Sequence, residues 1–167
     1  MKIYSFPSIS TPEANTLILG TMPGQRSIAM NQYYGHGGNA FWKIMFEVFE
    51  EKFTREYEIR RQLLIKNGIA LWDVLKACER EGSADHAIEK EEVNDFDQFF
   101  QTHSQIKLLA FNGIKAENYF MRSVHKRPGV PMIIMPSTSS ANGWMRYEQK
   151  LNAWKQIKNA SNEHRSQ

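Results

Sequence analysis

The stretch LILGTMPGQRSIAMNQYYGHGGNAFWKIMFEVF, residues 17–49, decides the fold of this chain. It opens with a continuous apolar run, which is typical of a strand buried on both faces of a parallel sheet. It closes with apolar residues at helical spacing, which predict an amphipathic helix. A plain strand-to-helix connection takes about 2–6 residues, whereas residues 22–38 separate the two elements here. A loop of this length, rich in Gly and Tyr, indicates a binding or catalytic site.

Strands and helices alternate along the rest of the chain. The predicted strands cover residues 15–21, 69–75, 106–113 and the start of 130–143. The predicted helices cover residues 39–53, 55–68, 94–104 (capped by Asn94), 114–126 and 147–160, the last with Leu151, Trp154 and Ile157 facing inward. The alternation predicts an α/β fold whose parallel sheet is covered by helices on both faces. We expect one domain over residues 1–167, with a charged, turn-rich segment at 78–95 and a frayed end at 161–167.

The composition is typical of a globular protein, with 41% hydrophobic and 23% charged residues. The single cysteine, Cys78, excludes an intramolecular disulfide and a multi-cysteine zinc site. No apolar run approaches the ~20 residues that span a bilayer, and the N-terminus lacks the apolar core of a signal peptide. We therefore expect no membrane partner and a cytoplasmic location. The net charge of +3 permits a polyanionic partner without requiring one.

Polar loops follow each predicted strand. In parallel α/β sheets, ligands bind beyond the carboxyl ends of the strands. The loops at those ends read GTMPGQRS (20–27), WDVLKACEREGS (72–83), FNG (111–113) and PSTSSANG (136–143). We expect all four to meet at one edge of the sheet.

Several residues in these loops have two interpretations. Tyr33 and Tyr34 are either core anchors or a stacking platform for a planar ligand such as a base. His36 is either a loop anchor or a general acid or phosphate contact. Asn39 is either a helix cap or the side chain that orients a water. Asn112 either closes a turn or reads the edge of a base.

Other functions are disfavoured. The chain lacks the motifs of a phosphate-binding loop, a dinucleotide fold, a serine-hydrolase elbow and a helical metalloprotease site. Asp73, Glu79 and Asp85 have no recognised metal-ligand spacing, so we interpret them as solvated or loop-fixing and expect no metal.

The small polar residues of 136–143 either cap the next helix or contact phosphates. The basic residues of the C-terminal third either lie on a solvated surface or follow a nucleic-acid backbone: Arg122, Lys126, Arg127, Arg146 and Lys150.

Taken together, the loops resemble those of the uracil-DNA glycosylase superfamily, and most closely its family 6, the hypoxanthine-DNA (deoxyinosine) glycosylases. The resemblance covers residues 15–154. It rests on LILGTMPGQRS and QYYGHGGNAFW, then GIALWDVLKACEREGSADHAI and NDF, then IKLLAFNG and PSTSSAN, in this order and at these spacings.

The resemblance implies a three-layer α/β/α sandwich with a central four-stranded parallel sheet. It implies a monofunctional DNA N-glycosylase that flips a deaminated base, foremost hypoxanthine, and hydrolyses its N-glycosidic bond to leave an abasic site. DNA is then the partner, the protein is expected to be a monomer, and no metal or small-molecule cofactor takes part.

The resemblance also implies roles for individual residues. Asn39 matches the catalytic side chain, with His36 as a secondary catalytic candidate. Tyr34 matches the aromatic that stacks on the flipped base. The base edge would be contacted by Asn112 and by main-chain groups near Met22 and Gly24. The loop that presses into the DNA comprises Ser137, Thr138, Ser139, Ser140 and Asn142.

The chain departs from the family pattern in two places. It reads HGGN where the family usually reads His-Pro-Arg-Asn, so Gly37 and Gly38 remove a rigid element and a positive charge beside Asn39. Ser140 replaces the proline of the usual PSTSPAN. Two alternatives therefore stay open: a uracil-excising glycosylase of the same fold, and a DNA-binding protein without catalysis.

Overall fold

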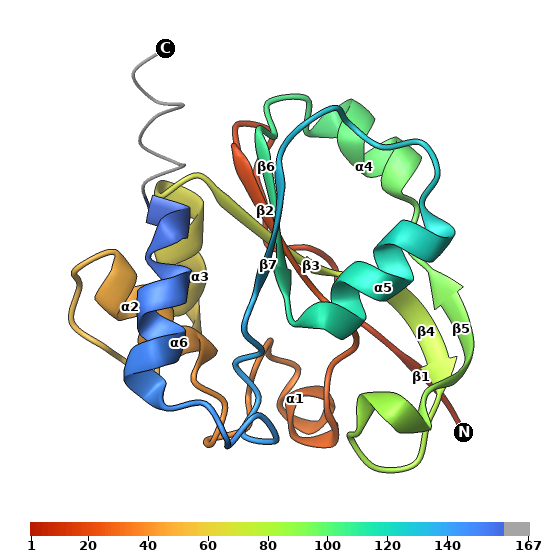
Figure 1. The fold of residues 1–167 in the computed structure, drawn as a ribbon, viewed down its shortest axis with the longest axis horizontal. Coiled ribbons are helices and arrows are strands. Elements are labelled where there is room, and N and C mark those ends of the chain that lie inside the picture. The colour runs from red at the N-terminus through yellow and green to blue at the C-terminus, as the bar shows by residue number, and fades with distance from the viewer. Residues whose placement is uncertain (159–167) are drawn as a thin grey trace.

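The computed structural model describes residues 1–158, and its centre is a four-stranded parallel sheet in the order β3-β2-β6-β7 (Figure 1). The strands are β2 (Thr16–Gly20), β3 (Ile69–Asp73), β6 (Leu108–Asn112) and β7 (Met132–Met135). Every residue of β2 is buried, as its continuous apolar run predicts. The register pairs Gly20 with Asp73 and Asn112 with Met135, so the strands end at the same edge of the sheet.

Helices cover both faces of this sheet, which confirms the predicted three layers (Figure 1). One face carries α2 (Phe41–Val48), α3 (Tyr57–Lys66) and α6 (Tyr147–Trp154). The other face carries α4 (Phe96–Thr102) and α5 (Ile114–Ser123). Each layer has its own apolar core, with Trp42 and Trp154 buried on the first face and Phe96 and Phe120 on the second. Removing this area from water stabilises the sandwich by about 25 cal/mol per Å² of apolar surface.

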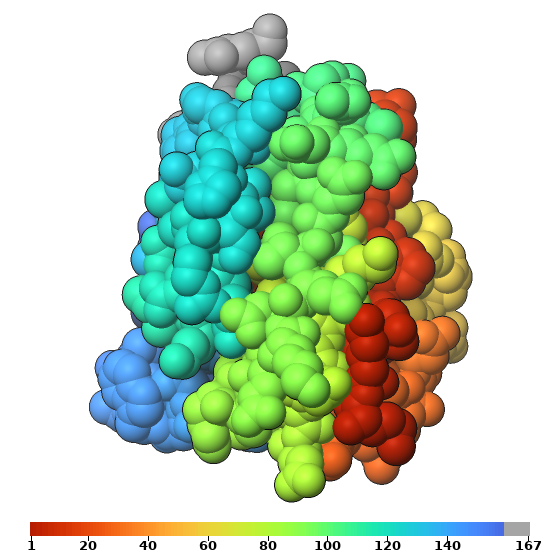
Figure 2. All heavy atoms as spheres, turned by 90° about the vertical axis from the view of Figure 1, so that its right-hand side faces the viewer, coloured from red at the N-terminus to blue at the C-terminus, as the bar shows by residue number. Residues whose placement is uncertain are grey.

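A small antiparallel sheet extends the second face, and the sequence did not predict it. It consists of β1 (Lys2–Tyr4), β4 (Leu75–Glu79) and β5 (Glu89–Val93), in the order β1-β4-β5. Four of the five residues of β5 are exposed charged side chains, so no apolar alternation marks it as a strand. In Figure 2 the N-terminal residues, the β4–β5 segment and α5 lie side by side on this face. The prediction of a turn-rich segment over 78–95 therefore missed β5 and the end of β4, whereas residues 81–87 between the two strands do form bends and a short turn.

The helix boundaries differ modestly from the predicted ones. The connection after β2 contains a short helix, α1 (Gln25–Met30), within what the sequence presented as a loop. The cap of α4 is Asp95, whose side chain accepts from the Gln98 N–H, rather than the predicted Asn94. The inward faces of Leu151, Trp154 and Ile157 are confirmed. The predicted frayed end at 161–167 lies outside the described residues.

Candidate active site

The carboxyl ends of three adjacent strands bring together Gly20, Asp73 and Asn112. A Cβ built on Gly20 would lie 2.6 Å from Asp73 Oδ1 and 2.7 Å from the Tyr34 hydroxyl oxygen. The carboxylate and the phenol therefore share the space beside one backbone position, and any side chain at residue 20 would displace them. This is the physical reason for a glycine at the end of β2, and it joins the long loop to the strand ends as the sequence predicted.

Polar groups at this edge are buried without hydrogen-bond partners. Within residues 1–158, the buried side-chain atoms with no partner are Tyr34 Oη, Asp73 Oδ2 and Arg80 Nη1. Leaving such a group unsatisfied costs about 1–3 kcal/mol, and more when it is charged. Asp73 and Arg80 are only 3% and 8% exposed, respectively. Buried polar atoms of this kind are typical of sites that receive a polar ligand.

Burial shifts the proton equilibria of the same cluster. Desolvation, followed by repulsion from Asp85, raises the pKa of Asp73 from 3.8 to about 7, although Arg80 opposes the shift. Burial also raises the pKa of Asp85, offset by Arg80 and by the Thr21 hydroxyl. The pKa of Tyr34 lies far above 10, because burial and the nearby Asp73 both disfavour the phenolate. Tyr34 therefore stays a neutral hydroxyl donor.

The two tyrosines of the loop point to different places. Tyr33 is a core anchor: its hydroxyl donates to the Pro7 carbonyl at 2.9 Å, and its own carbonyl accepts from Trp42 Nε1 at 2.7 Å. Tyr34 has a left-handed backbone, with φ of 52°, which directs its side chain the other way. Its ring packs on Phe41 with centroids 4.2 Å apart, and its hydroxyl reaches the strand ends.

Asn39 lies where the loop enters α2 and has the capping contact expected of it. Its Oδ1 accepts from the Phe41 N–H at 3.0 Å, although Ala40 is the last residue before the helix. The Ala40 N–H donates to the Thr138 carbonyl at 3.0 Å, so Asn39 is held beside the loop that follows β7. The cap fixes the amide in place and leaves its second lone pair and its N–H groups for other contacts.

His36 and the two glycines form the exposed tip of the loop. The Gly38 N–H donates to His36 Nδ1 at 2.9 Å, so this nitrogen is an acceptor. A Cβ on Gly38 would lie about 3.1 Å from the His36 ring and 3.2 Å from the Cβ of Ser140. The two departures from the family pattern, at Gly38 and Ser140, therefore lie against each other.

Asn112 is tied to the loop after β7. Its Nδ2 donates to Thr138 Oγ1 and its Oδ1 accepts from the Thr138 N–H, each at 3.0 Å. Thr138 is fully buried, so its side chain holds Asn112 rather than facing solvent. The Asn112 amide opposes the rise in the pKa of Tyr34, although no hydrogen bond of normal geometry joins the two side chains.

The rest of this loop is more exposed. Ser137 and Ser139 accept hydrogen bonds from nearby backbone N–H groups, and Asn142 Nδ2 donates to the Ser137 carbonyl. Lys150 is buried, and its Nζ donates to the Ser139 carbonyl at 3.3 Å, so it supports the loop from below. Trp144 follows at the surface and is 81% exposed. Small hydroxyl residues and one large aromatic thus face solvent beside the strand ends.

The loop after β4 secures the loop after β2. Arg80 Nη2 donates to the Pro23 carbonyl at 2.6 Å, and Ser83 Oγ accepts from the Gln25 N–H at 2.9 Å. A Cβ on Gly24 would lie 3.3 Å from Ser83 Oγ, so this close approach favours glycine. Met22 is buried in the core beneath α4 and α5, which leaves only its main chain for a ligand.

Sequence reasoning missed Asp73 and Arg80. The interpretation of Asp73 as a solvated acid is wrong, because it is one of the most buried polar side chains of the described chain. The available signal was its position in IALWD, directly at the end of a buried strand and level with GTMPG. Arg80 had no such signal, because its role depends on a loop contact across the chain.

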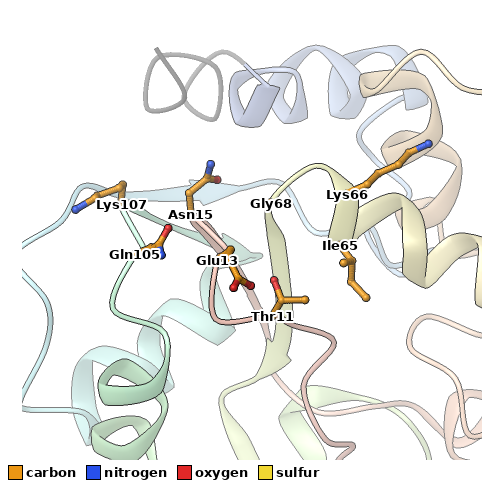
Figure 3. A pocket seen from close by; sticks show the side chains of 8 residues that line it. All are labelled: Thr11, Glu13, Asn15, Ile65, Lys66, Gly68, Gln105 and Lys107. Atoms are coloured by element: carbon orange, nitrogen blue, oxygen red, sulfur yellow. The ribbon is translucent and has the colours of Figure 1, made fainter. Parts of the chain in front are cut away.

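The opposite edge of the sheet has an open hollow of about 410 Å³ (Figure 3). Its lining residues are Thr11, Glu13, Asn15, Ile65, Lys66, Gly68, Gln105 and Lys107. It lies at the amino ends of β2, β3 and β6, and the predicted site residues lie at the other edge.

Residues 1–158 also contain no group of three or more potential metal ligands. In the same residues, no helix is long and apolar enough to cross a membrane.

Comparison with known proteins decides the family. The model of the Uracil DNA glycosylase superfamily matches residues 7–158. The chain belongs to this superfamily. The matched range contains all four loops at the carboxyl edge, so the superfamily assignment covers the whole candidate site.

Individual relatives in sequence and structure agree with membership of the uracil-DNA glycosylase superfamily. A Methanosarcina barkeri protein named Hypoxanthine DNA glycosylase is 38% identical over 143 residues, which cover 85% of this chain and 89% of that protein. A Methanosarcina acetivorans protein of the same name is 38% identical over 82% of this chain and 86% of its own length. A solution structure from Methanosarcina acetivorans, described as a candidate uracil DNA glycosylase, has a TM-score of 0.80 and 34% identity. It covers 96% of this chain and 99% of that chain.

Proposed function

We propose that this protein is a DNA glycosylase that releases hypoxanthine from DNA and leaves an abasic site. The observation that carries the proposal is the 38% identity, over 85% of this chain, to a protein named Hypoxanthine DNA glycosylase. The geometry supports it, because loops from four strands meet around buried polar groups that lack partners. Hypoxanthine pairs weakly, so flipping it from the duplex costs less than flipping a normal base.

The chemistry assigned to the site follows from the groups available. Cleavage of the N-glycosidic bond leaves negative charge on the purine and an oxocarbenium-like sugar. A positioned amide can assist this reaction by orienting the attacking water. Asn39 has this role in the proposal, because its cap to Phe41 fixes the amide at the start of α2. An amide is a weak base, so the sugar–base bond breaks before water adds. His36, at the exposed tip of the loop, is the secondary candidate and contacts the leaving group or a phosphate.

The base and the DNA strand are assigned to different parts of the edge. Tyr34, with Asn112 and the main chain of Met22 and Gly24, contacts the flipped base. Ser137, Ser139, Ser140 and Asn142, which are partly or fully exposed, contact the strand, and the buried Thr138 holds the loop to Asn112. Trp144 adds a flat apolar surface on the same loop, and base–aromatic stacking contributes about 1–3 kcal/mol per base. We propose that the protein acts as a monomer without a metal or cofactor.

Uracil excision is the second candidate activity. The solution structure with 34% identity is described as a candidate uracil DNA glycosylase. Hypoxanthine and uracil share an N–H group next to a carbonyl, so one set of polar groups can contact either base.

The test is base release from matched duplexes that carry one hypoxanthine, one uracil or no lesion, followed by alkaline cleavage of the abasic site. We expect hypoxanthine release to be fastest. Release of uracil without release of hypoxanthine would support the same reaction with uracil, rather than hypoxanthine, as the substrate. Binding of the duplex without release of any base would favour the DNA-binding alternative and point to Gly37 and Gly38 as the altered part of the loop.

A further inference from the structure

Arg80 is a buried cation that joins two loops of the carboxyl edge. It is only 8% exposed, and its Nη1 has no hydrogen-bond partner within residues 1–158. Its Nη2 donates to the Pro23 carbonyl at 2.6 Å, and its Nε donates to the Gly82 carbonyl at 3.0 Å. Burying a charge costs free energy, and a link between two loops does not require a charge. The guanidinium at this place therefore indicates a role beyond holding the loops together.

The contact with Pro23 sets the direction of a main-chain donor. The Pro23 C=O and the Gly24 N–H belong to one peptide unit, and in a trans peptide these two groups point in opposite directions. No cis peptide bond occurs in residues 1–158. The Gly24 N–H therefore points away from the guanidinium, and it makes no hydrogen bond among the same residues. Arg80 thus fixes the direction of an unpaired donor in the loop after β2.

A neighbouring peptide unit of this loop is held in a similar way by the main chain. The Thr21 carbonyl accepts from the Leu75 N–H at 3.2 Å, so the Met22 N–H of that unit points away from β4. Pro23 lies beyond this pairing, and the Arg80 side chain supplies the donor that the main chain no longer offers. The N–H groups that remain for a ligand are those of Met22 and Gly24.

Resting on the proposed function, we infer that Arg80 is a positioning residue that orients and polarises the Pro23–Gly24 peptide, so that the Gly24 N–H donates to the departing base. The electron pair of the N-glycosidic bond goes to the purine as the bond breaks. Main-chain donors aimed at such developing charge are a large source of catalysis. A cation on the carbonyl oxygen draws electron density from the amide and strengthens the N–H as a donor.

The charges around Arg80 agree with this role. Burial raises the pKa of Asp73 and of Asp85, and Arg80 opposes the rise in each. Carboxylates beside a departing anion repel it, and the fixed positive charge of an arginine offsets this repulsion. Lys115 and His86 also interact with Asp85, but both are exposed, so water and salt screen them. Arg80 is therefore the buried cation beside the two acids.

The test compares variants of Arg80 in single-turnover release of hypoxanthine at saturating enzyme, with duplex affinity measured separately. Arg80→Gln removes the charge and keeps an N–H donor. We expect it to slow release by about tenfold or more, because deleting a main-chain-type donor outright costs about 10²–10³-fold. The dissociation constant of the duplex should stay within about twofold of wild type, since exposed residues contact the strand. Arg80→Lys keeps the charge and should restore most of the lost rate.

Ser83→Ala is the matched control for the attachment of the loops. It removes the other link between them, the hydrogen bond from the Gln25 N–H to Ser83 Oγ, without changing the charge. Ser83 is exposed, and release should stay within about twofold of wild type. Equal losses in Arg80→Gln and Ser83→Ala, or a loss confined to duplex affinity, would overturn the inference and give Arg80 a structural role.

The amide resonance of Gly24 provides a second measurement, which does not depend on the folding of a variant. Free hypoxanthine, added to the wild-type protein together with a duplex that carries an abasic-site analogue, should shift the Gly24 amide proton downfield. An unchanged resonance would overturn the inference. Normal release by Arg80→Gln would overturn the inference alone, whereas a wild-type protein that releases no base from any duplex would overturn the proposed function and the inference with it.

Discussion

The two edges of the central sheet differ in how their polar groups are satisfied. The amino edge has the open hollow, lined by polar side chains that face solvent, such as Glu13, Gln105 and Lys107. The carboxyl edge has buried polar atoms without partners, on Tyr34, Asp73 and Arg80. Water satisfies the polar groups of an open hollow, whereas a buried group without a partner raises the free energy of the folded state until a ligand binds it.

The loops at the carboxyl edge are also linked to one another by hydrogen bonds. At the carboxyl edge, contacts between distant segments hold the loops together: Ala40 to Thr138, Thr138 to Asn112, and Arg80 to Pro23. These bonds fix the polar groups before a ligand arrives, which is what preorganised catalysis needs. The following variants test whether function belongs to the carboxyl edge alone, in order of decreasing expected effect.

The largest effect is expected from Asn39→Ala. If Asn39 orients the attacking water, hypoxanthine release should fall by about 10²–10⁴-fold, a range typical of positioned groups in proton transfer. Single-turnover release and a DNA-binding titration measure the two steps separately, and binding should be unchanged. Asn118→Ala, an exposed asparagine on α5, is the control. Near-normal release by Asn39→Ala would remove Asn39 from the chemistry and leave it as a helix cap.

The second effect is on stability, through Asp73→Asn. The pKa of Asp73 is 3.8 when unperturbed and about 7 in the folded protein, because of burial and Asp85, with Arg80 opposing. Between these values the folded state binds the proton that the unfolded state has lost, so the free energy of unfolding falls as pH rises. Above pH 7 this difference in pKa destabilises the folded protein by about 2–4 kcal/mol. The side chain introduced by Asp73→Asn does not titrate, so the variant should lack this destabilisation. Urea unfolding at pH 5 and pH 8 measures it.

The direction of the change in the free energy of unfolding distinguishes an unsatisfied carboxylate from a satisfied one. Relative to wild type, Asp73→Asn should gain stability at pH 8 and gain less at pH 5, because only part of the range between 3.8 and about 7 has been crossed there. Glu13→Gln, an exposed carboxylate of the amino-edge hollow, should show no such difference. A loss of stability at pH 8 in Asp73→Asn would mean that the carboxylate is satisfied within the protein and has no need of a ligand.

A smaller effect is expected from Trp144→Ala. The indole is 81% exposed, so the variant should unfold as wild type does. Loss of stacking on DNA should weaken binding by about tenfold, within the range measured for base–aromatic contacts. Trp42 and Trp154 are buried and Trp72 is partly buried, so the part of the emission quenching by DNA that is lost in Trp144→Ala reports on Trp144. Ile59→Ala, on the outer surface of α3, is the control, and equal affinities of the two variants would exclude a DNA contact by Trp144.

The smallest effect is expected at the amino edge. Lys107→Ala removes an exposed cation from the hollow in Figure 3 and should change hypoxanthine release by less than about twofold, as surface substitutions usually do. Release rates at two salt concentrations would show whether this cation contributes to DNA attraction. A loss of hypoxanthine release comparable to that of Asn39→Ala would contradict the assignment of function to the carboxyl edge alone.

Much of the fold was predictable from the sequence because its signals are local. The apolar run of β2 and the helical spacing of Trp42, Met45 and Phe46 depend on neighbours within a few residues. The antiparallel sheet was not predictable, because the exposed residues of β5 owe their strand conformation to pairing with β4. The predicted site residues came together because parallel strands end level at one edge.

By itself, the sequence determined the α/β architecture, the edge at which the four polar loops meet and the residue types on those loops. Periodicity and chain order are enough for these, since parallel strands in succession place their following loops together. Only the tertiary structure decided that Asp73 is buried beside Tyr34 with its Oδ2 lacking a hydrogen-bond partner, and that Arg80 holds the loop after β2. Burial and hydrogen bonding depend on atoms distant in sequence. The same aspartate that reads as a solvated acid in IALWD therefore becomes, once folded, a carboxyl group with a pKa of about 7.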